Sequence, residues 1–325
     1  MTISKEDLQG ISIEELRSLG LDSLSLRAKT KAYFAGTQAI RDFAYQVMLP
    51  LLKGQLNLRP IEKALYGTYL RMYAWIDSVI RLNKIADLQA VGSAARALFE
   101  QLVDIELLVA NIPNDAVTKF FEFTKVARFH YAQKYHDYES KKVVTPPTHT
   151  LSNLRKLVND PQEKAKIEQL VITHWGKTKS GKPNFPDHWS NMPLNERASK
   201  IDAHGSAAPN KKSIKYEGHY REYYPFFSWQ VHPGLVGFGG LDVSDLEVFF
   251  VRAHSEISAL FTIATLIVAD QLKLTPAINA HARANLPSLI EEIRLVPGEE
   301  IVKEQVKTLK KLKKTSLEDD KKEIS

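Results

Sequence analysis

The chain has 325 residues, of which 44% are hydrophobic and 25% charged, and its formal net charge at pH 7 is +6. This apolar fraction excludes global disorder, because a chain of this composition and length can bury a sizeable core. The chain contains no cysteine, which excludes disulfide scaffolds, cysteine-ligated zinc, iron–sulfur clusters and thiol nucleophiles. We expect a protein that needs no cofactor.

The N-terminal sequence MTISKEDLQG lacks the basic and apolar parts of a secretory signal. The most apolar run is 257–269, which holds thirteen residues, whereas a membrane span needs about 20. The run therefore predicts a buried core helix. Together with the absence of cysteine, these features predict a cytoplasmic protein that does not engage a membrane.

The first half of the chain places apolar residues at helical spacing between few glycines and prolines. Residues 1–22 are predicted to form an N-terminal arm with a short capped helix. Longer helices are predicted over about 23–50, from Pro60 onward, over about 87–110, and from about 115 to 139.

The middle of the chain is richer in proline, and residues 141–215 are predicted to form a loop-rich insert. Alternating strand patterns are nearly absent, so the predicted class is all-α, with a single bundle-like domain over 23–296 and a Lys-rich tail over 297–325. Later helices are predicted over about 149–158, 161–174, 194–203, 212–231, 244–272 and 276–294.

Several catalytic motifs are excluded by their neighbouring residues. Gly176 and Gly181-Lys182 have the spacing of a phosphate-binding loop, but Pro183 stands where that loop needs Ser or Thr for magnesium. No His-Glu-x-x-His or Glu-x-x-His occurs, which argues against zincin proteases and di-iron bundles. We therefore expect no metal site, and residues 176–183 are predicted to form a basic loop.

Residues 216–232, YEGHYREYYPFFSWQVH, combine aromatic side chains with two histidines. In a helix, Tyr220, Tyr224, Ser228 and His232 would follow one face at intervals of four residues. That face supplies donors, acceptors and one group that titrates near neutrality. One hypothesis makes His232 an acid or base, with Tyr224 and Ser228 beside it and Tyr220 binding a ligand. The alternative is core packing with satisfied polar tips, His232 capping the helix end.

Arg96 and Glu100 form a second polar pair, because residues four apart in a helix can form an ion pair. Their neighbours in the sequence are apolar. One hypothesis is an arginine held by Glu100 and directed at a phosphate or carboxylate. The other is a partly exposed helix pair that contributes little to stability.

Three short motifs, in a fixed order over about residues 60–270, resemble an uncharacterised bacterial all-helical family of unknown function. The motifs are Arg-x-x-x-Glu, His-Trp and Tyr-x-x-x-Ser-x-x-x-His. The resemblance implies a compact helical domain with these polar residues facing one another, and it implies no established activity. Some relatives are similar to HEPN-like or phage-defence helical proteins. Pro225 departs from the pattern because it would kink the helix. The matching residues are Arg96, Glu100, His188, Trp189, Tyr224, Ser228 and His232.

Arg197 and His204 also have the Arg-to-His spacing found in HEPN ribonucleases. A chain of this length is expected to produce such a spacing by chance, so the pair carries no weight by itself.

The positive charge is concentrated in two segments. Residues 176–221 hold nine Lys/Arg against four acids, and residues 303–314 hold six Lys against one Glu. Cations interleaved with aromatic rings are typical of RNA or single-stranded nucleic acid binding. Our first hypothesis is therefore a nucleic-acid- or nucleotide-directed helical protein, RNase-like or defence-related. The alternatives are a non-catalytic protein-interaction module and an enzyme acting on a small phosphorylated or acidic metabolite.

Overall fold

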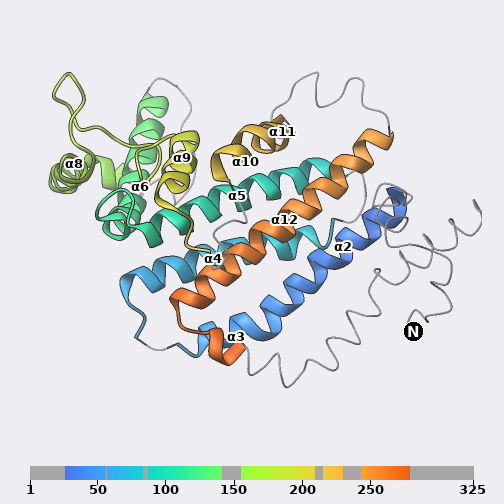
Figure 1. Ribbon diagram of the computed structural model, residues 1–325. Helices are drawn as coiled ribbons and strands as arrows, with labels where there is room; N and C mark the ends of the chain where they lie inside the picture. Colours follow the sequence, from blue (N-terminus) through green and yellow to red (C-terminus); the bar gives the residue numbers. More distant parts are fainter. Residues whose placement is uncertain are drawn as a thin grey trace, which may run out of the picture. The chain divides into compact units, whose positions relative to one another are not determined.

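The structure is a computed structural model that describes residues 26–55, 57–82, 87–140, 155–208, 215–229 and 243–278. Within these ranges every regular element is a helix (Figure 1), which confirms the all-α class. The arm 1–22 and the tail 297–325 lie outside the described residues. The helices are α2 (Leu26–Phe43), the π-helix η2 (Ala44–Met48), α3 (Leu49–Lys53), α4 (Pro60–Val79), α5 (Leu88–Ala110), α6 (Ala116–Ser140), α8 (Pro161–Trp175), α9 (Leu194–His204), α10 (Tyr216–Glu222), α11 (Tyr224–Trp229) and α12 (Val243–Gln271).

The helix ends follow local capping chemistry. Helix α8 begins with Pro161 after the N-cap Asp160, whose carboxylate accepts the backbone N–H groups of Gln162 and Glu163. It ends at Gly176, whose φ of 79° is costly for residues with a side chain. The helix predicted over 161–174 therefore agrees with the observed bounds of α8 to within one residue.

The prediction of a single helix over 212–231 is wrong, because the structure has two helices there, α10 and α11, separated at Tyr223. Pro225 causes the break, since its ring nitrogen has no N–H to donate to the preceding turn. The chain restarts at once, and the backbone N–H of Phe227 bonds the carbonyl of Tyr223 at 3.1 Å. Tyr220 and Tyr224 consequently stand on different helices.

The described residues divide into two compact units, and the divisions fall before Asn57, inside α4, inside α5 and after Arg221. The first unit contains the described residues of 26–55, 69–102 and 222–278. In this unit α2 and α12 lie side by side (Figure 1). The ring of Tyr69 on α4 stacks on that of Phe261 on α12 at 5.2 Å, within a core formed also by Met72, Ile76, Leu98, Ile257, Leu260 and Ala264.

A polar contact crosses the interface of α2 and α12. The hydroxyl of Thr37 lies 3.1 Å from Nδ1 of His254 and 2.9 Å from the hydroxyl of Ser258. Thr37 and His254 are both fully buried. Burial lowers the pKa of His254 to about 4, so the imidazole is neutral near neutral pH.

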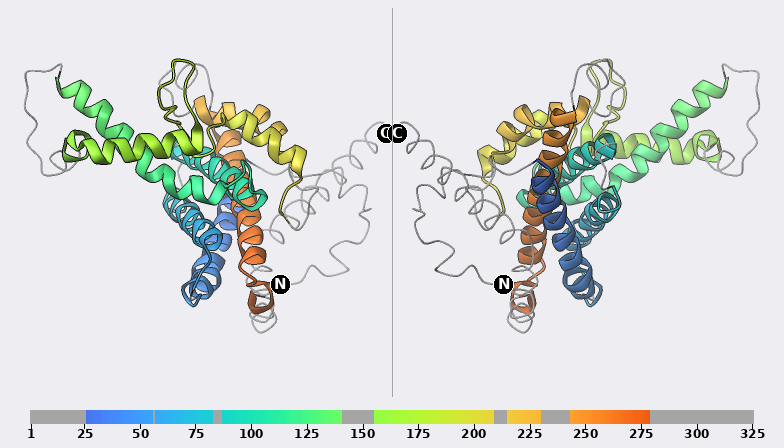
Figure 2. Two further views of the ribbon diagram at one scale, coloured as in Figure 1. Left: turned by 90° about the vertical axis from the view of Figure 1, so that its left-hand side faces the viewer. Right: turned by 90° about the vertical axis from the view of Figure 1, so that its right-hand side faces the viewer.

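The second unit contains the described residues of 57–68 and 103–221. Helices α6 and α8 cross in both views of Figure 2 and are in contact. They are joined by a cluster of buried side chains, Val126 and Phe129 from α6 and Ile167, Val171 and Trp175 from α8, with Phe185 packed against it. This cluster fixes the start of the segment that follows α8.

Among the described helices, Val248–Gln271 is long and apolar enough to cross a membrane by length and composition. Half of its most apolar window is buried inside the protein. Core helices of soluble proteins have the same features, so the location of the protein stays a prediction.

Candidate functional site

The segment that follows α8 begins with a hairpin, residues 176–184. Lys177 and Pro183 form an isolated antiparallel bridge, and the Thr178 N–H bonds the Lys182 carbonyl at 2.8 Å. Gly181 sits in the turn with φ 82°, a conformation that glycine adopts at low cost. The predicted basic loop thus has a defined backbone path.

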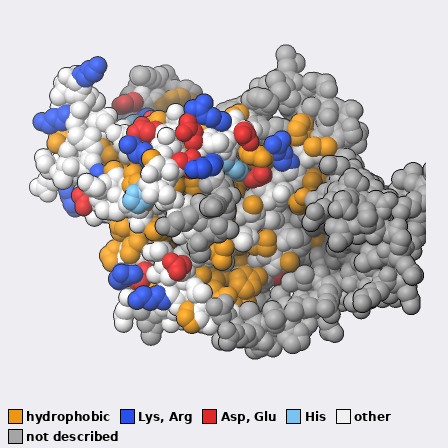
Figure 3. Space-filling model, in the orientation of Figure 1, with side chains coloured by type: hydrophobic (Ala, Val, Ile, Leu, Met, Phe, Trp, Pro, Cys, Tyr) orange, Lys and Arg blue, Asp and Glu red, His pale blue; other side chains and the backbone are white. Residues whose placement is uncertain are grey.

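The side chains of Lys177, Lys179 and Lys182 are exposed on this hairpin. Figure 3 shows the Lys and Arg side chains on the projecting loop at the upper left. None of the three lysines forms an ion pair with a described residue, and residues 176–184 contain no Asp or Glu. The hairpin therefore presents uncompensated positive charge.

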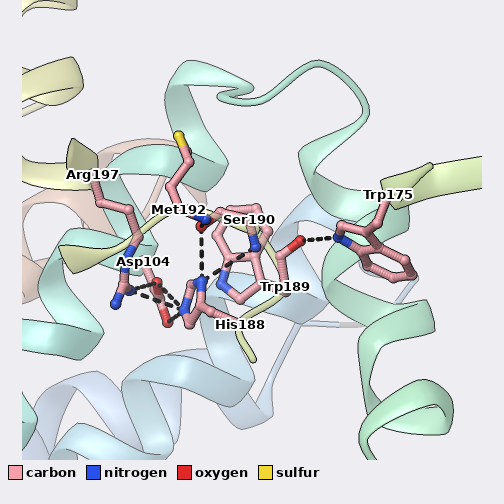
Figure 4. A network of polar contacts seen from close by, with 7 residues as sticks. All are labelled: Asp104, Trp175, His188, Trp189, Ser190, Met192 and Arg197. Atoms are coloured by element: carbon pink, nitrogen blue, oxygen red, sulfur yellow. Dashed lines mark hydrogen bonds and ion pairs between the residues drawn. The ribbon is translucent and has the colours of Figure 1, made fainter. Parts of the chain in front are cut away.

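His188 lies in a polar cluster with residues from two helices (Figure 4). Its Nε2 is 3.1 Å from Oδ1 of Asp104 on α5, and Nη1 of Arg197 on α9 donates to the same oxygen at 3.0 Å. The side chain of Arg197 is 8% exposed. The carboxylate of Asp104 thus compensates a buried guanidinium, which would otherwise be strongly destabilising.

The other nitrogen of the His188 ring contacts its own loop. Nδ1 accepts the backbone N–H of Ser190 at 3.2 Å, and a backbone N–H can only donate. Nε2 lies 2.9 Å from Nη1 of Arg197 as well as 3.1 Å from Oδ1 of Asp104, so the three side chains meet at this nitrogen. His188 and Arg197 both contact the carboxylate of Asp104, which ties the loop 185–193 to α5.

Ser190, His188 and Asp104 are the residue types of a nucleophilic triad, but their geometry does not fit that chemistry. The Ser190 hydroxyl lies 2.8 Å from Nδ1, yet the serine is 4% exposed. A substrate carbonyl would have to reach this hydroxyl, and a triad histidine must accept its proton. The arrangement instead holds the loop in place.

Trp189, between His188 and Ser190, is buried in the second unit. Its ring meets Phe120 edge to face at 5.8 Å, and its carbonyl accepts the indole N–H of Trp175 at 2.8 Å. The predicted His-Trp pair thus comprises a histidine with a polar partner and a tryptophan that packs in the core. Burial leaves Trp189 no open ring face.

A second carboxylate of α5, Glu106, is 1% exposed and has three donors. The hydroxyl of Tyr216 donates to Oε1 at 2.5 Å, the hydroxyl of Ser206 donates to the same oxygen, and the Ala207 N–H donates to Oε2 at 2.7 Å. Burial and the neighbouring carboxylate raise the pKa of Tyr216 far above its ordinary value. Glu106 thus joins α5 to α10 and to the turn after α9.

In the first unit, the predicted pair Arg96–Glu100 is present and has a third member. Nε of Arg96 donates to Oε1 of Glu100 at 2.9 Å, and the hydroxyl of Tyr224 donates to the same oxygen at 2.6 Å. The guanidinium carbon lies 5.1 Å from the centre of the Tyr224 ring. Burial, followed by the Glu100 hydrogen bond, raises the pKa of Tyr224 to about 12, so its phenol acts as a donor near neutral pH.

The remaining predicted residues are placed as follows. Ser228 is half-buried on α11, and its hydroxyl has no hydrogen-bond partner in the described part of the chain. His232 lies outside the described residues. Tyr220 borders an open hollow of about 560 Å³ in the second unit, lined also by Glu196, Glu217 and Arg221.

Asp104, Glu106 and Tyr216 were not predicted from the sequence, and Arg197 was given no weight by its spacing to His204. One signal could have found the two acids, since they interrupt the apolar run LVDIELL on the buried side of α5. A carboxylate in such a run must find donors or a cation when the helix packs. Arg197, the partner of Asp104, and Tyr216, the partner of Glu106, are each about a hundred residues further along the chain, so no local pattern indicates them.

Together these features define an all-α protein with carboxylate-centred polar networks and an exposed basic hairpin. The sequence model of the Family of unknown function (DUF5677) matches residues 62–246, and the chain belongs to this family. The matched range includes the hairpin 176–184 and the two carboxylates of α5, Asp104 and Glu106. No curated protein and no solved structure matches the chain.

Proposed function

We propose that this protein binds single-stranded nucleic acid through the hairpin 176–184. The observation that carries the proposal is the set of three exposed lysines without a carboxylate partner among the described residues. Each such cation can replace a counterion on a phosphate backbone, which favours binding entropically.

The hydrogen bonds of the hairpin support this role. The Gly181 N–H bonds the Thr178 carbonyl at 2.9 Å, and the Asn184 N–H bonds the Gly176 carbonyl at 3.0 Å. A segment that is already ordered loses less conformational entropy on binding. Beyond the hairpin, Asp104 and Arg197 hold the loop that carries His188, so the base of the hairpin is fixed to the second unit.

The rest of the predicted basic region contributes less to this proposal. The hollow beside α9 and α10 contains Glu196 and Glu217, and Arg221 there pairs with Glu217 at 2.6 Å. These carboxylates would repel phosphates. Within 176–221, the lysines of the hairpin are therefore the main cations available to bind phosphates. The segment 303–314 lies outside the described residues.

Fluorescence anisotropy with a labelled oligouridine of about 20 nucleotides, over a series of salt concentrations, tests the proposal. Each phosphate contact on a single strand contributes about −0.7 to the slope of log K against log salt. Lys177→Gln, Lys179→Gln and Lys182→Gln combined should therefore make the slope shallower by about 2.

A matched variant separates local from general charge effects. Lys53, Lys63 and Lys273 are also exposed, and changing all three to Gln removes the same charge elsewhere. This control should retain the wild-type slope. Equal slopes for the two triple variants would contradict the assignment to the hairpin, and no salt-dependent binding by the wild type would refute the proposed function.

A second candidate function is an enzyme or receptor for a small phosphorylated or acidic metabolite at Arg96. The hydrogen bond to Glu100 uses Nε, and the side chain of Arg96 is 28% exposed. Inorganic phosphate or succinate, titrated by calorimetry against wild type and Arg96→Gln, tests it. Identical heats for the two proteins would remove this candidate.

A further inference from the structure

Helix α6 carries a row of exposed aromatic and cationic side chains that the sequence analysis did not single out. The row advances by four, three, three, four and three residues, which keeps it on one face of an α-helix. We call it the α6 stripe; its members are the half-buried Tyr135 and the exposed Phe121, Lys125, Arg128, Tyr131 and Tyr138.

The rings of the stripe are unusually exposed for aromatic side chains. Tyr131 is 61% exposed, Tyr138 54% and Phe121 42%. The ring of Tyr131 stacks near that of Tyr135, with centroids 6.5 Å apart and planes 29° apart. The opposite face of α6 is buried against α8 through Val126 and Phe129. The core of the second unit therefore does not need the stripe.

The charge of the stripe favours one kind of partner. Arg128 is exposed and has no carboxylate partner within the described ranges, while Lys125 pairs with Glu122 at 2.8 Å. Lys134 is exposed beside the stripe. No member of the row is acidic, so an anionic partner that also offers flat apolar surfaces is complementary. Unpaired nucleobases on a phosphate backbone have both properties.

We infer that the α6 stripe is the surface on which bases of a single-stranded nucleic acid stack, with Arg128 at the backbone phosphates. The inference rests on the proposed function and assigns the stacking part of it to α6. The stripe extends over about 25 Å, given the rise of 1.5 Å per residue, so several bases can lie along it.

The stripe and the hairpin are connected within the second unit. The ring of Phe185, one residue beyond the hairpin, lies 5.1 Å from the ring of His130, the residue before Tyr131. A strand held by the hairpin lysines can therefore continue over the edge of α6. The lysines supply salt-dependent attraction, and the stripe supplies stacking that depends little on salt.

The test replaces rings while keeping apolar bulk and helix propensity. Phe121→Leu, Tyr131→Leu and Tyr138→Leu combined remove π-faces without adding a charge or a helix breaker. Tyr45→Leu with Trp75→Leu is the matched control, because both rings are exposed in the first unit, at 62% and 38%. Circular dichroism verifies that both variants remain folded.

The stripe variant should bind the oligouridine at least about fivefold more weakly for each base that loses its stack. Its salt slope should stay at the wild-type value, because no cation is removed. Binding of inorganic polyphosphate, which has no bases, should be unchanged. The control variant should match the wild type with both probes.

Each other outcome overturns the inference in a recognisable way. If only the hairpin lysine variant weakens binding, the stripe is not the stacking surface, although the proposed function stands. If the wild type binds no oligouridine, both fail. Equal losses for polyphosphate and oligouridine would refute stacking. A wild-type dimer that the stripe variant abolishes, seen by light scattering, would show instead that two copies pair through α6.

Discussion

Acidification should destabilise this protein through His254, because the unfolded chain takes up a proton there that the folded protein excludes. The side chain is fully buried on α12, and burial lowers its pKa to about 4, against about 6.5 in an unfolded chain. The stabilising contribution is therefore complete above about pH 6.5 and is lost as the pH falls toward 4. The gap between these pKa values corresponds to about 3 kcal/mol in the free energy of unfolding.

Glu256, two residues further along α12, acts in the opposite direction. Burial raises its pKa to about 7, while Arg252 lowers it. Its contribution is therefore present below about pH 4.3 and is lost as the pH rises toward 7. The pH profile of the wild type contains both effects, so His254 must be isolated by difference.

The assay is urea unfolding, followed by circular dichroism, of the wild type and His254→Gln between about pH 4 and 7.5. The wild-type minus variant difference in unfolding free energy should fall by about 3 kcal/mol from neutral to acid pH. His204→Gln removes an exposed histidine and should run parallel to the wild type. A His254→Gln curve that also runs parallel would refute the assignment of a neutral, buried imidazole.

Two carboxylate networks give further predictions for unfolding experiments. Tyr216→Phe removes a buried donor to Glu106 and should lower the free energy of unfolding by about 1–3 kcal/mol. Tyr224→Phe removes a donor to the more exposed carboxylate of Glu100 and should lower it by less than about 1 kcal/mol. Equal losses for the two variants would contradict the role of burial. Asp104→Asn leaves the charge of Arg197 buried without compensation and should cost about 3–5 kcal/mol. Adding Arg197→Met should then restore part of the loss, and simple additivity would show that the two side chains are not coupled.

Local chemistry explains which parts of the fold were predictable. Helix α8 is readable because Asp160, Pro161 and Gly176 mark its ends within the chain itself. Helix α5 is readable because its apolar residues recur at helical intervals. The prediction of one helix over 212–231 was wrong at Pro225. The aromatic residues on either side keep helical spacing, but proline has no backbone N–H to donate and interrupts the helix.

The candidate site was predictable only where its members are neighbours in sequence. Arg96 and Glu100 are four residues apart on one helix, so spacing alone predicts their ion pair. Tyr224, the third member of that cluster, was expected to share a face with Tyr220, and the break before α11 separates them. Its contact with Glu100 spans 124 positions in the sequence.

The helical spacing of the α6 stripe can be read from the sequence, yet the stripe was not predicted. Its rings lie among the buried Val126 and Phe129, and the sequence does not say which aromatic residues of a helix face the core. Packing of α6 against α8 decides that, because it buries one face and leaves Tyr131 and Tyr138 in solvent.

The sequence by itself determined the helical class, the absence of cysteine chemistry and the position of most of the charge. These properties depend on composition and on residues within a few positions of one another. Tertiary structure alone decided that Asp104 compensates Arg197 and that Glu106 receives the hydroxyl of Tyr216. Contacts across such distances in the chain arise only when helices pack, since burial forces each carboxylate to find its donors.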